Sequence, residues 1–534
     1  MLVHILPYVK QKYPLILLLL AFRLFPCQSI AQPLAAGQKK FVGNVVSNGF
    51  SIRADFPTYW NQVTAENAGK WGNVESSPGV YNWTALDNIY TYAVNNGYPY
   101  KHHTLVWGQQ QPAFLGSLDS AQQYQEIVNW FVESGNRYLS ATFVDVVNEP
   151  LHAPPTYAQA LGGSGVTGWD WVIRAFELAR EHWRFRKLHL NEYSVINDNS
   201  ANAQFLQIIN LLKTRGLIDG IGVQCHRFEI ESPSLTTLRN NLNNLAATGL
   251  PVYITEFDLG NYGNSGVPND SVQLALYKQR FPVLWEHPGV KGMTLWGYAQ
   301  GEMWQTTAYL VRSNTTERPS MVWLRKYLAT PLPPLLVAPL GATGVPRNPV
   351  LIWQKPPLAD SYRIQIATDT FFTSVVADSS TTDTLMQSYP LGSNTKFYWR
   401  ASASNDSGVS SYSVAGSFTT GDQIVSVEES GGLPAEFALY QNYPNPFNPA
   451  TVIKYFVPQV SVRQDNILEN ANLRYISLRV YNPLGQLVAT LVDAAQAPGE
   501  HRVMWDASIV PGGVYFYRLQ AGGFTHVKKM IIIR

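Results

Sequence analysis

Residues 142–150, TFVDVVNEP, hold the stretch that decides the fold. The apolar run FVDVV, residues 143–147, predicts a buried strand, and this strand stops at Asn148, Glu149 and Pro150. Proline closes the strand because it lacks the N–H that a strand interior donates. A surface turn is one explanation for an amide and a carboxylate at this point, and a functional site is the other. The rest of the chain decides between them.

The stretch belongs to an alternation of strands and helices that runs from residue 40 to residue 330. The predicted strands are FVGNVV (41–46), NQVTAEN (61–67), YKHHTLVW (100–107), FVDVVNEP (143–150), KLHLNEY (187–193), GIGVQCH (220–226), PVYITEFD (251–258) and GMTLWG (292–297). Amphipathic stretches lie between them, such as YQEIVNWFVESGNRY (124–138) and AQFLQIINLLKTRG (203–216). This pattern predicts an α/β fold, a (β/α)8 TIM barrel. An open doubly wound sheet is the alternative, but it more often carries a Gly-rich phosphate loop after its first strand.

Polar side chains end the predicted strands, where a barrel places its functional groups. From the second strand on, these residues are Glu66 and Asn67, His103 and Trp107, Asn148 and Glu149, Asn191 and Tyr193, Gln224 and His226, Glu256 and Asp258, and Trp296. Any one of them can be a hydrogen-bonded core group. Buried polar groups are costly unless paired, so packing is a poor explanation for the whole set.

Two of these residues, Glu149 and Glu256, form the kind of pair that glycoside hydrolysis needs. One carboxyl protonates the leaving oxygen while the other stays ionised, and a barrel mouth can bring the two face to face. Asn148 can hydrogen-bond a sugar hydroxyl beside the reacting carbon. His226 can hold Glu256 as an anion and lower its pKa, with Asp258 orienting His226. A solvated loop acid is the alternative for each glutamate taken alone.

The composition suits a neutral polar ligand. The 534 residues carry a net charge of +2, and only 14% are charged, so nothing points to nucleic acid. Trp (15) and Tyr (29) are plentiful, and aromatic faces pack on the C–H faces of sugars.

Residues 40–330 resemble family 10 glycoside hydrolases, whose typical member is a retaining endo-β-1,4-xylanase. The matching segments are TAENAGKW (64–71), HTLVWGQQQP (103–112), DVVNEP (145–150), LNEY (190–193), GIGVQCH (220–226), ITEFDL (254–259) and LWGYAQGEMW (295–304). The resemblance implies that Glu149 is the acid/base and Glu256 the nucleophile, with support for the nucleophile from Gln224 and His226. It implies a double displacement between carboxyls about 5–5.5 Å apart, with no metal or organic cofactor.

The resemblance also assigns the sugar contacts. Binding on the non-reducing side falls to Glu66, Asn67, Lys70, His103, Trp107 and Gln110, and Trp296 and Trp304 wall the cleft. Asn148, Tyr193, Gln224 and His226 complete the predicted sugar-binding set. Five positions depart from the family pattern. Gly108 stands where many members carry a second His after the Trp, Glu192 and Ser194 replace Asp and Asn, and Ala299 and Gln300 replace the usual polar or charged pair. Activity is still expected, and these departures bear on subsite preference and rate.

The N-terminus predicts export. Lys10 and Lys12 precede the apolar run PLILLLLAF (14–22), which is too short to span a bilayer, so residues 1–31 read as a signal peptide. A buried N-terminal helix is the alternative. Pro26 before Cys27 argues against a lipoprotein signal. Cleavage leaves Cys225 as the single cysteine, expected inside an apolar strand as a small buried hydrophobe, without a disulfide.

Two small all-β sandwich domains are expected after the barrel (38–330). Residues 336–420 resemble a fibronectin type III domain, read as a spacer in preference to a sugar-binding module. Residues 436–534, with YPNPFNP (443–449), closely resemble the C-terminal sorting domain of type IX secretion, with a longer loop at 459–474. This implies export across the outer membrane by that machinery, followed by removal of the domain. A plain accessory β domain is the alternative.

The sequence thus predicts a secreted or surface-attached monomeric endo-1,4-β-xylanase acting on xylan. A β-1,4-glucanase on the same scaffold is the runner-up, and a non-catalytic surface polysaccharide-binding protein is the third reading. Lys70, Gln110 and Trp304 separate the first two, because they can crowd a hexose CH2OH that xylose lacks. Intact Glu149 and Glu256 argue against the third, since binding alone gives no reason to keep both.

Overall fold

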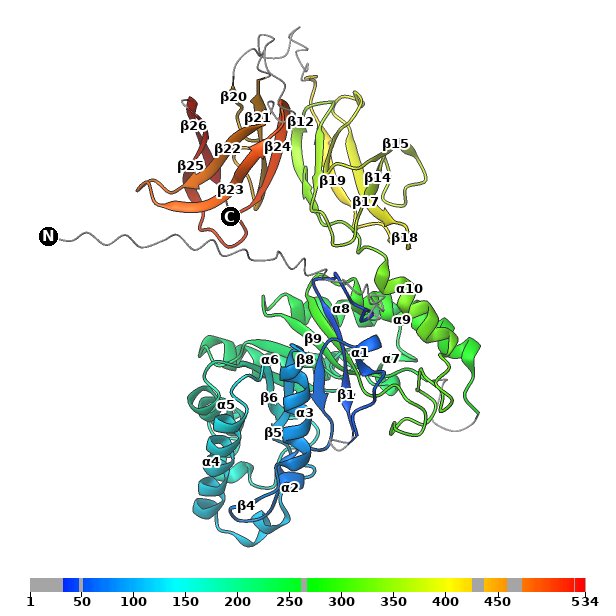
Figure 1. The fold of residues 1–534 in the computed structure, drawn as a ribbon, viewed down its shortest axis with the longest axis vertical. Coiled ribbons are helices and arrows are strands. Elements are labelled where there is room, and N and C mark those ends of the chain that lie inside the picture. Colours follow the sequence, from blue (N-terminus) through cyan, green and yellow to red (C-terminus); the bar gives the residue numbers. More distant parts are fainter. Residues whose placement is uncertain are drawn as a thin grey trace, which may run out of the picture.

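The structure is a computed structural model that describes residues 32–47, 51–260, 267–424, 437–458, 473–522 and 524–533 (Figure 1). The predicted signal peptide (1–31), with Cys27, lies outside the described residues. So does nearly all of the predicted long loop at 459–474.

Within the described residues, eight parallel strands close into a barrel. They follow one another around it in chain order: β1 (Phe41–Val46), β2 (Val63–Ala65), β5 (Tyr100–Val106), β6 (Phe143–Asn148), β7 (Lys187–Glu192), β8 (Gly220–Val223), β9 (Val252–Phe257) and β10 (Val290–Leu295). β10 pairs with β1 and completes the ring, with Phe41 opposite Gly292. The closure confirms the predicted (β/α)8 TIM barrel and excludes the open doubly wound sheet.

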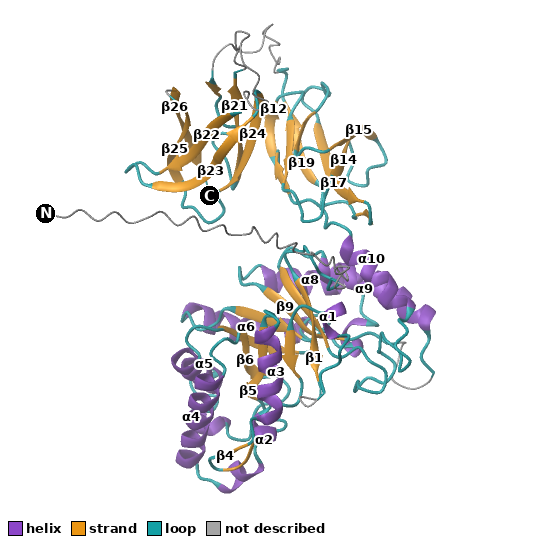
Figure 2. Ribbon diagram, in the orientation of Figure 1, coloured by secondary structure: helices purple, strands orange, loops and turns teal. Residues whose placement is uncertain are grey.

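Helices cover the outside of the barrel (Figure 2). The longer ones are α3 (Thr84–Asn95), α4 (Ser120–Arg137), α5 (Asp170–His182), α6 (Asn199–Thr214), α8 (Leu235–Ala246), α9 (Asp270–Trp285) and α10 (Pro319–Ala329). The short elements are α1 (Phe56–Tyr59), α2 (Trp71–Val74), α7 (Arg227–Ile230), η1 (Ala113–Ser117), η2 (Ala158–Leu161), β3 (Glu75–Ser77) and β4 (Val80–Tyr81). In α8, Leu238, Leu242 and Leu245 repeat at helical spacing and are buried. The apolar stripe of each helix therefore packs onto the strands.

Cys225 does not lie inside a strand, contrary to the prediction. β8 ends at Val223, and Cys225 follows it with a left-handed backbone (φ 64°). It is a free, fully buried thiol, as expected of a small hydrophobe. The strand ends early because Gln224 and His226 turn into the barrel mouth.

Residues 336–420 form two packed sheets. One contains β11 (Leu336–Ala338), β13 (Val350–Trp353) and β16 (Leu385–Gln387). The other contains β12 (Ala342–Val345), β19 (Gly416–Thr420), β17 (Lys396–Asn405), β14 (Ser361–Ala367) and β15 (Val375–Thr381), with β18 (Gly408–Val409) on β17. Trp353 and Trp399, one from each sheet, share a buried core. The segment is all-β, as predicted, and its likeness to fibronectin type III stays a prediction.

The C-terminal segment also has two sheets. β20 (Ala438–Leu439), β21 (Ala450–Val457) and β24 (Gly499–Asp506) form one, and β23 (Leu487–Gln496), β22 (Arg474–Tyr481), β25 (Gly513–Ala521) and β26 (Phe524–Ile532) the other. Tyr455, Leu478 and Tyr517 meet in the core between them. The domain limits 38–330, 336–420 and 436–534 stay predictions.

The middle sandwich touches the barrel at the end opposite to the predicted site. The Ser411 hydroxyl donates to Glu286 Oε2 at 2.6 Å, and Asn405 Nδ2 donates to the Ala329 carbonyl at 2.9 Å. Glu286 directly follows α9 and lies shortly before Val290, the first residue of β10. This contact therefore lies at the amino ends of the strands. The carboxyl ends, which carry the polar residues, face away from it.

Candidate active site

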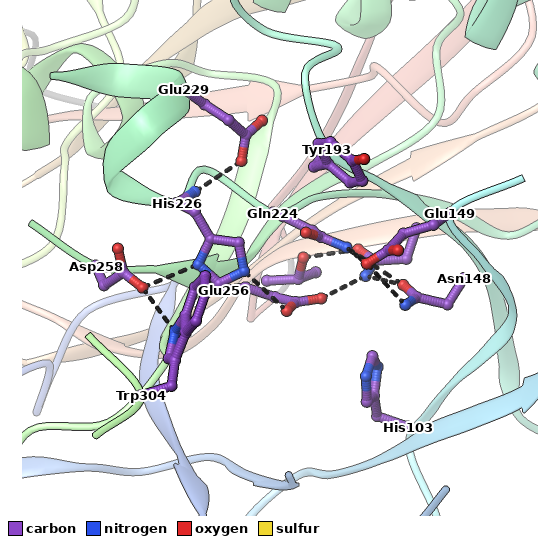
Figure 3. A network of polar contacts seen from close by, with 12 residues as sticks. His103, Asn148, Glu149, Tyr193, Gln224, His226, Glu229, Glu256, Asp258 and Trp304 are labelled. Atoms are coloured by element: carbon purple, nitrogen blue, oxygen red, sulfur yellow. Dashed lines mark hydrogen bonds and ion pairs between the residues drawn. The ribbon is translucent and has the colours of Figure 1, made fainter. Parts of the chain in front are cut away.

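Glu149 begins the loop after β6 and turns the chain sharply. Its backbone is left-handed (φ 54°), and its N–H donates to the Asn191 carbonyl at 2.8 Å. Its side chain accepts a hydrogen bond from Trp107 Nε1 at 2.9 Å. It accepts another from Gln224 Nε2 at 2.9 Å (Figure 3). β6 thus ends at Asn148, because the turn at Glu149 takes its side chain out of the sheet and into the mouth of the barrel.

Glu256 sits near the end of β9 and is held by two groups. Asn191 Nδ2 donates to Glu256 Oε1 at 2.7 Å, and His226 Nε2 lies 3.2 Å from Oε2. The other ring nitrogen of His226, Nδ1, lies 2.9 Å from Asp258 Oδ2. The ring of His226 therefore bridges two carboxylates, and Asp258 orients it as predicted.

Asn191 joins the two glutamates. Its Nδ2 donates both to Glu256 and to Asn148 Oδ1, each at 2.7 Å, while Asn148 Nδ2 lies 3.3 Å from Glu149 Oε1. Gly222 lies opposite Asn191 in the sheet, and a Cβ there would stand 2.3 Å from Asn191 Oδ1. A glycine is therefore required for Asn191 to reach Glu256. Both carboxylates belong to one buried polar network, which Figure 3 shows.

The surroundings favour an anionic Glu256. Burial alone raises the pKa of its carboxyl, but the hydrogen bond from His226 and the positive charges of His103 and His226 outweigh burial, and the pKa is lowered. Burial also lowers the pKa of His226, yet Asp258 and Glu256 overcome it and raise the pKa to about 10. Glu256 is therefore an ionised carboxylate beside an imidazolium, as the sequence predicts.

The His226 imidazolium predicts a pH-dependent stability. Its folded pKa of about 10 exceeds the ordinary 6.5, so its contribution is complete below about pH 6.5 and is lost as the pH rises toward 10. We expect the free energy of unfolding to fall by up to about 1.4 kcal/mol per pH unit over that window. Asp258→Asn should flatten this slope, because it removes the charge that most raises the pKa. Melting temperatures of both proteins at pH 6.5 to 10 test this, and equal slopes would contradict it.

The predicted non-reducing-side residues cluster beside the carboxylates. Asn67 Oδ1 accepts from Lys70 Nζ at 3.1 Å and from Gln110 Nε2 at 3.3 Å, and the Lys70 ammonium lies 4.9 Å from the centre of the Trp107 ring. Burial lowers the pKa of Lys70, although Glu256, Glu66 and Glu149 act in the opposite direction. Glu66 directly follows β2 and is partly exposed.

His103 is held by Asp145, a buried carboxylate that also pairs with Lys101. Its Nδ1 lies 2.9 Å from Asp145 Oδ2, and Lys101 Nζ lies 2.8 Å from Asp145 Oδ1. His103 lies within β5, three residues before its end, so it was not placed correctly as a strand-end residue. Asp145 orients the imidazole from inside the barrel.

Aromatic rings surround the network. The Trp296 ring lies edge-on to His103 at 5.3 Å, and the Trp304 ring lies edge-on to His226 at 4.9 Å. Trp304 is 48% exposed, yet its Nε1 donates to Asp258 Oδ2 at 3.1 Å, which fixes its orientation. Tyr193 stacks on His152 with ring centres 4.0 Å apart. The rings thus lie beside the network, and the role of Trp296 and Trp304 as cleft walls stays a prediction.

One predicted role needs correction. The Gln224 side chain contacts Glu149 and not the expected nucleophile; only its backbone carbonyl supports Glu256, accepting from its N–H at 2.9 Å. Trp107 donates to Glu149 as well, and its contact with sugar stays a prediction. Trp107 and Gln224 can both donate to Glu149 because the turn at Glu149 places its carboxylate between the loops after β5 and β8.

Four residues of the site lack a predicted role: Asn191, Asp145, Glu192 and Glu229. Asn191 carried a usable signal, since a polar residue ended its strand. Glu229 stands three residues after His226, the spacing at which a glutamate side chain bonds the backbone N–H before a helix. Asp145 carries no signal, because it lies within a run that reads as ordinary strand, and Glu192 stands out only as a departure from the family pattern.

The structure explains one departure from the family pattern. A Cβ on Gly108 would lie 2.4 Å from the Pro154 carbonyl and 2.5 Å from the Ala153 carbonyl. The loop after β6 therefore fills the place that a second histidine would take. Ala299 is buried and pairs with Val311, while Gln300 is exposed and accepts from the Ser313 N–H at 3.1 Å.

Neither a metal cluster nor a membrane-spanning helix is found in the described part of the chain. No group of three or more His, Cys, Asp or Glu side chains there is placed to hold a metal ion. Every helix of the same residues is too short or too polar to cross a membrane.

Two parts of the chain match models of known protein families. Residues 441–533 match the model of a secretion system C-terminal sorting domain. Endo-1,4-beta-xylanase B of Cellvibrio japonicus is 40% identical over 290 residues, which are 54% of this chain and 45% of that protein. Beta-1,4-xylanase of Dictyoglomus thermophilum is 29% identical over 259 residues, 46% of this chain and 73% of that protein.

A GH10 structure from Paenibacillus barcinonensis has a TM-score of 0.49 at 21% identity, covering 55% of this chain and 97% of that one. The glycosyl hydrolase family 10 model matches residues 32–327, more than half of the chain. The protein therefore belongs to glycosyl hydrolase family 10.

Proposed function

We propose that the protein is an endo-1,4-β-xylanase that retains the configuration of the anomeric carbon. The observation that carries this is the pair Glu149 and Glu256 in one hydrogen-bonded network at the carboxyl ends of β6 and β9. Family membership and the xylanase names of similar proteins support the substrate.

Glu256 acts as the nucleophile in this proposal. The imidazolium of His226 and the Asn191 amide stabilise its negative charge, and Asn191 also fixes its Oε1. Glu256 attacks the anomeric carbon, and a covalent glycosyl-enzyme forms as the bond to the leaving oxygen breaks.

Glu149 is the acid/base in this proposal. It donates its proton to the leaving oxygen, then removes a proton from the water that attacks the glycosyl-enzyme. Trp107 and Gln224 each donate to one of its oxygens, so they fix the carboxyl in the plane that these transfers need. The expected separation of about 5–5.5 Å between the carboxyls stays a prediction.

The sugar-binding assignments stay part of the proposal. Glu66, Asn67, Lys70, His103, Trp107 and Gln110 bind the non-reducing side, with Trp296 and Trp304 as cleft walls and Asn148 and Tyr193 near the bond that breaks. Asn67 already accepts from Lys70 and Gln110. These side chains are therefore held together before the sugar arrives, and they leave little freedom to admit a CH2OH group.

Reducing-sugar release from xylan, cellulose and mixed-linkage β-glucan tests the substrate. We expect xylo-oligosaccharides from xylan and little release from the two glucans. Release from glucans alone would keep the mechanism and replace the substrate with β-1,4-glucan. A folded protein that releases nothing from any polymer would support the non-catalytic binder.

The C-terminal sorting domain indicates export across the outer membrane, to the cell surface or beyond it. We propose that the secretion machinery is a partner through this domain, and that the protein acts as a monomer. The middle sandwich serves as a spacer in this proposal. It holds the barrel by the end opposite to the cleft, which leaves the cleft free for a polymer.

A further inference from the structure

Two further carboxylates, Glu192 and Glu229, lie fully buried beside the catalytic pair. Neither is expected to touch substrate, because the carboxylate oxygens of each already accept hydrogen bonds from backbone N–H groups of the loops at the barrel mouth. Glu192 is the last residue of β7, and Glu229 lies in α7, directly after β8. Glu192 contacts the loop that begins at Glu149, and Glu229 contacts the loop that carries His226.

Glu192 holds the loop that begins at Glu149. Its Oε2 accepts from the Leu151 N–H at 2.7 Å, and its Oε1 lies 2.9 Å from His152 Nδ1. Oε1 also accepts from the Tyr193 N–H at 2.8 Å. Glu192 therefore fixes the two residues that follow Glu149 and Pro150.

Glu229 holds the loop that carries His226. Its Oε2 accepts from the His226 N–H at 2.7 Å, as Figure 3 shows, and its Oε1 accepts from the Ser194 N–H at 2.6 Å. His226 in turn contacts Glu256. Glu229 therefore reaches the nucleophile through one intermediate residue, while it bridges the loops after β7 and β8.

The backbone at these points needs such support. Glu149, Ser194 and Cys225 all have left-handed φ values, of 54°, 61° and 64°. A non-glycine residue in this conformation is strained and persists only where its surroundings hold it. Glu229 binds the N–H of Ser194 itself and the N–H that follows Cys225. Glu192 binds the Leu151 N–H, the first N–H after Glu149, because Pro150 has none.

We propose that Glu192 and Glu229 are positioning residues with separate tasks: Glu192 places the acid/base Glu149, and Glu229 places the nucleophile Glu256 through His226. This inference rests on the proposed function. It gives a role to one departure from the family pattern, Glu192, whose carboxylate holds the loop after Glu149.

The separate tasks predict different responses to the leaving group. A dinitrophenolate departs without protonation, so a misplaced Glu149 matters little for a dinitrophenyl β-xylobioside. A misplaced nucleophile slows attack on every substrate. Glu192→Gln should therefore lower kcat/KM for xylohexaose on the order of 10²-fold, and about tenfold less for the dinitrophenyl glycoside. Glu229→Gln should lower both about equally.

Glutamine keeps the volume of each side chain but has one acceptor oxygen in place of two, so it breaks contacts without leaving a cavity. The matched control is Glu75→Gln, since Glu75 is equally buried and also accepts two hydrogen bonds, from Trp71 Nε1 and the Gly79 N–H. It precedes neither catalytic loop. Any loss in this control should be small and the same for both substrates.

Each outcome decides a separate question. If Glu192→Gln and Glu229→Gln lose activity in the same ratio on both substrates, as a purely structural effect would produce, the separate tasks are wrong. Losses matched by Glu75→Gln would also overturn the inference. A folded parent protein inactive on both substrates would instead overturn the proposed function. Melting temperatures show that each variant is folded at the assay temperature.

Discussion

Glu256→Ala is expected to lower kcat on xylo-oligosaccharides by on the order of 10⁴-fold or more, the largest effect of any single change. No other carboxylate of the network can replace it. Glu149 is held by Trp107 and Gln224, and Asp258 is held by His226 and Trp304. Losses of initial rate with xylohexaose measure the effect directly.

Azide distinguishes loss of a nucleophile from general damage. The alanine leaves room beside His226 and Asn191, where a small anion can take the place of the carboxylate and attack the same face of the sugar. With dinitrophenyl β-xylobioside the product should be the α-glycosyl azide, identified by NMR. Glu181→Ala, which removes an exposed acid (67%) at the end of α5, serves as control and should keep the parent rate. An active Glu256→Ala protein would mean that another residue is the nucleophile.

The sequence predicts the barrel well because each strand and helix carries its own periodic signal. The stretch FVDVVNEP predicts a buried strand that ends in functional polar residues. In the structure β6 ends at Asn148, and the side chain of Glu149 lies in the mouth of the barrel. The likeness to family 10 then places the two carboxylates. What it does not supply is the set of hydrogen bonds that each polar residue makes.

Irregularities in the strands account for much of the difference. Asp145 and Asn148 are three residues apart, so a regular strand would point them to opposite faces. In the structure both reach groups inside the barrel, Lys101 and Asn191 respectively. The register between β6 and β7 shifts between Asp145 and Val147, which reverses the alternation. An alternation of apolar and polar residues cannot reveal such a bulge.

Contacts between distant loops account for the rest. Gly108 reads as a lost histidine in the sequence, but the Ala153 and Pro154 carbonyls occupy the space where its side chain would begin. Glu192 and Ser194 read as two unrelated departures, yet buried carboxylates tie both to neighbouring loops. Each explanation needs residues more than thirty positions apart, which no local pattern joins.

Glu149→Ala is expected to show the second largest effect, and one that depends on the substrate. General acid catalysis contributes about 10²–10⁴-fold, so the loss of kcat/KM on xylohexaose should fall in that range. With dinitrophenyl β-xylobioside the first step needs no proton, and the glycosyl-enzyme should accumulate because no base activates water. A burst of dinitrophenolate followed by slow turnover, recorded by stopped-flow absorbance, is the expected trace.

The stereochemistry of rescue separates the two glutamates. Azide needs no general base, so it should attack the glycosyl-enzyme of Glu149→Ala and give the β-glycosyl azide, the opposite anomer to that from Glu256→Ala. Glu149→Gln is the matched variant, because an amide can keep partners among Trp107, Gln224 and Asn148 while it cannot transfer the proton. A β-azide from Glu256→Ala and an α-azide from Glu149→Ala would exchange the two assignments. The pair of products therefore decides which carboxylate attacks and which protonates, independently of how much rate either variant retains.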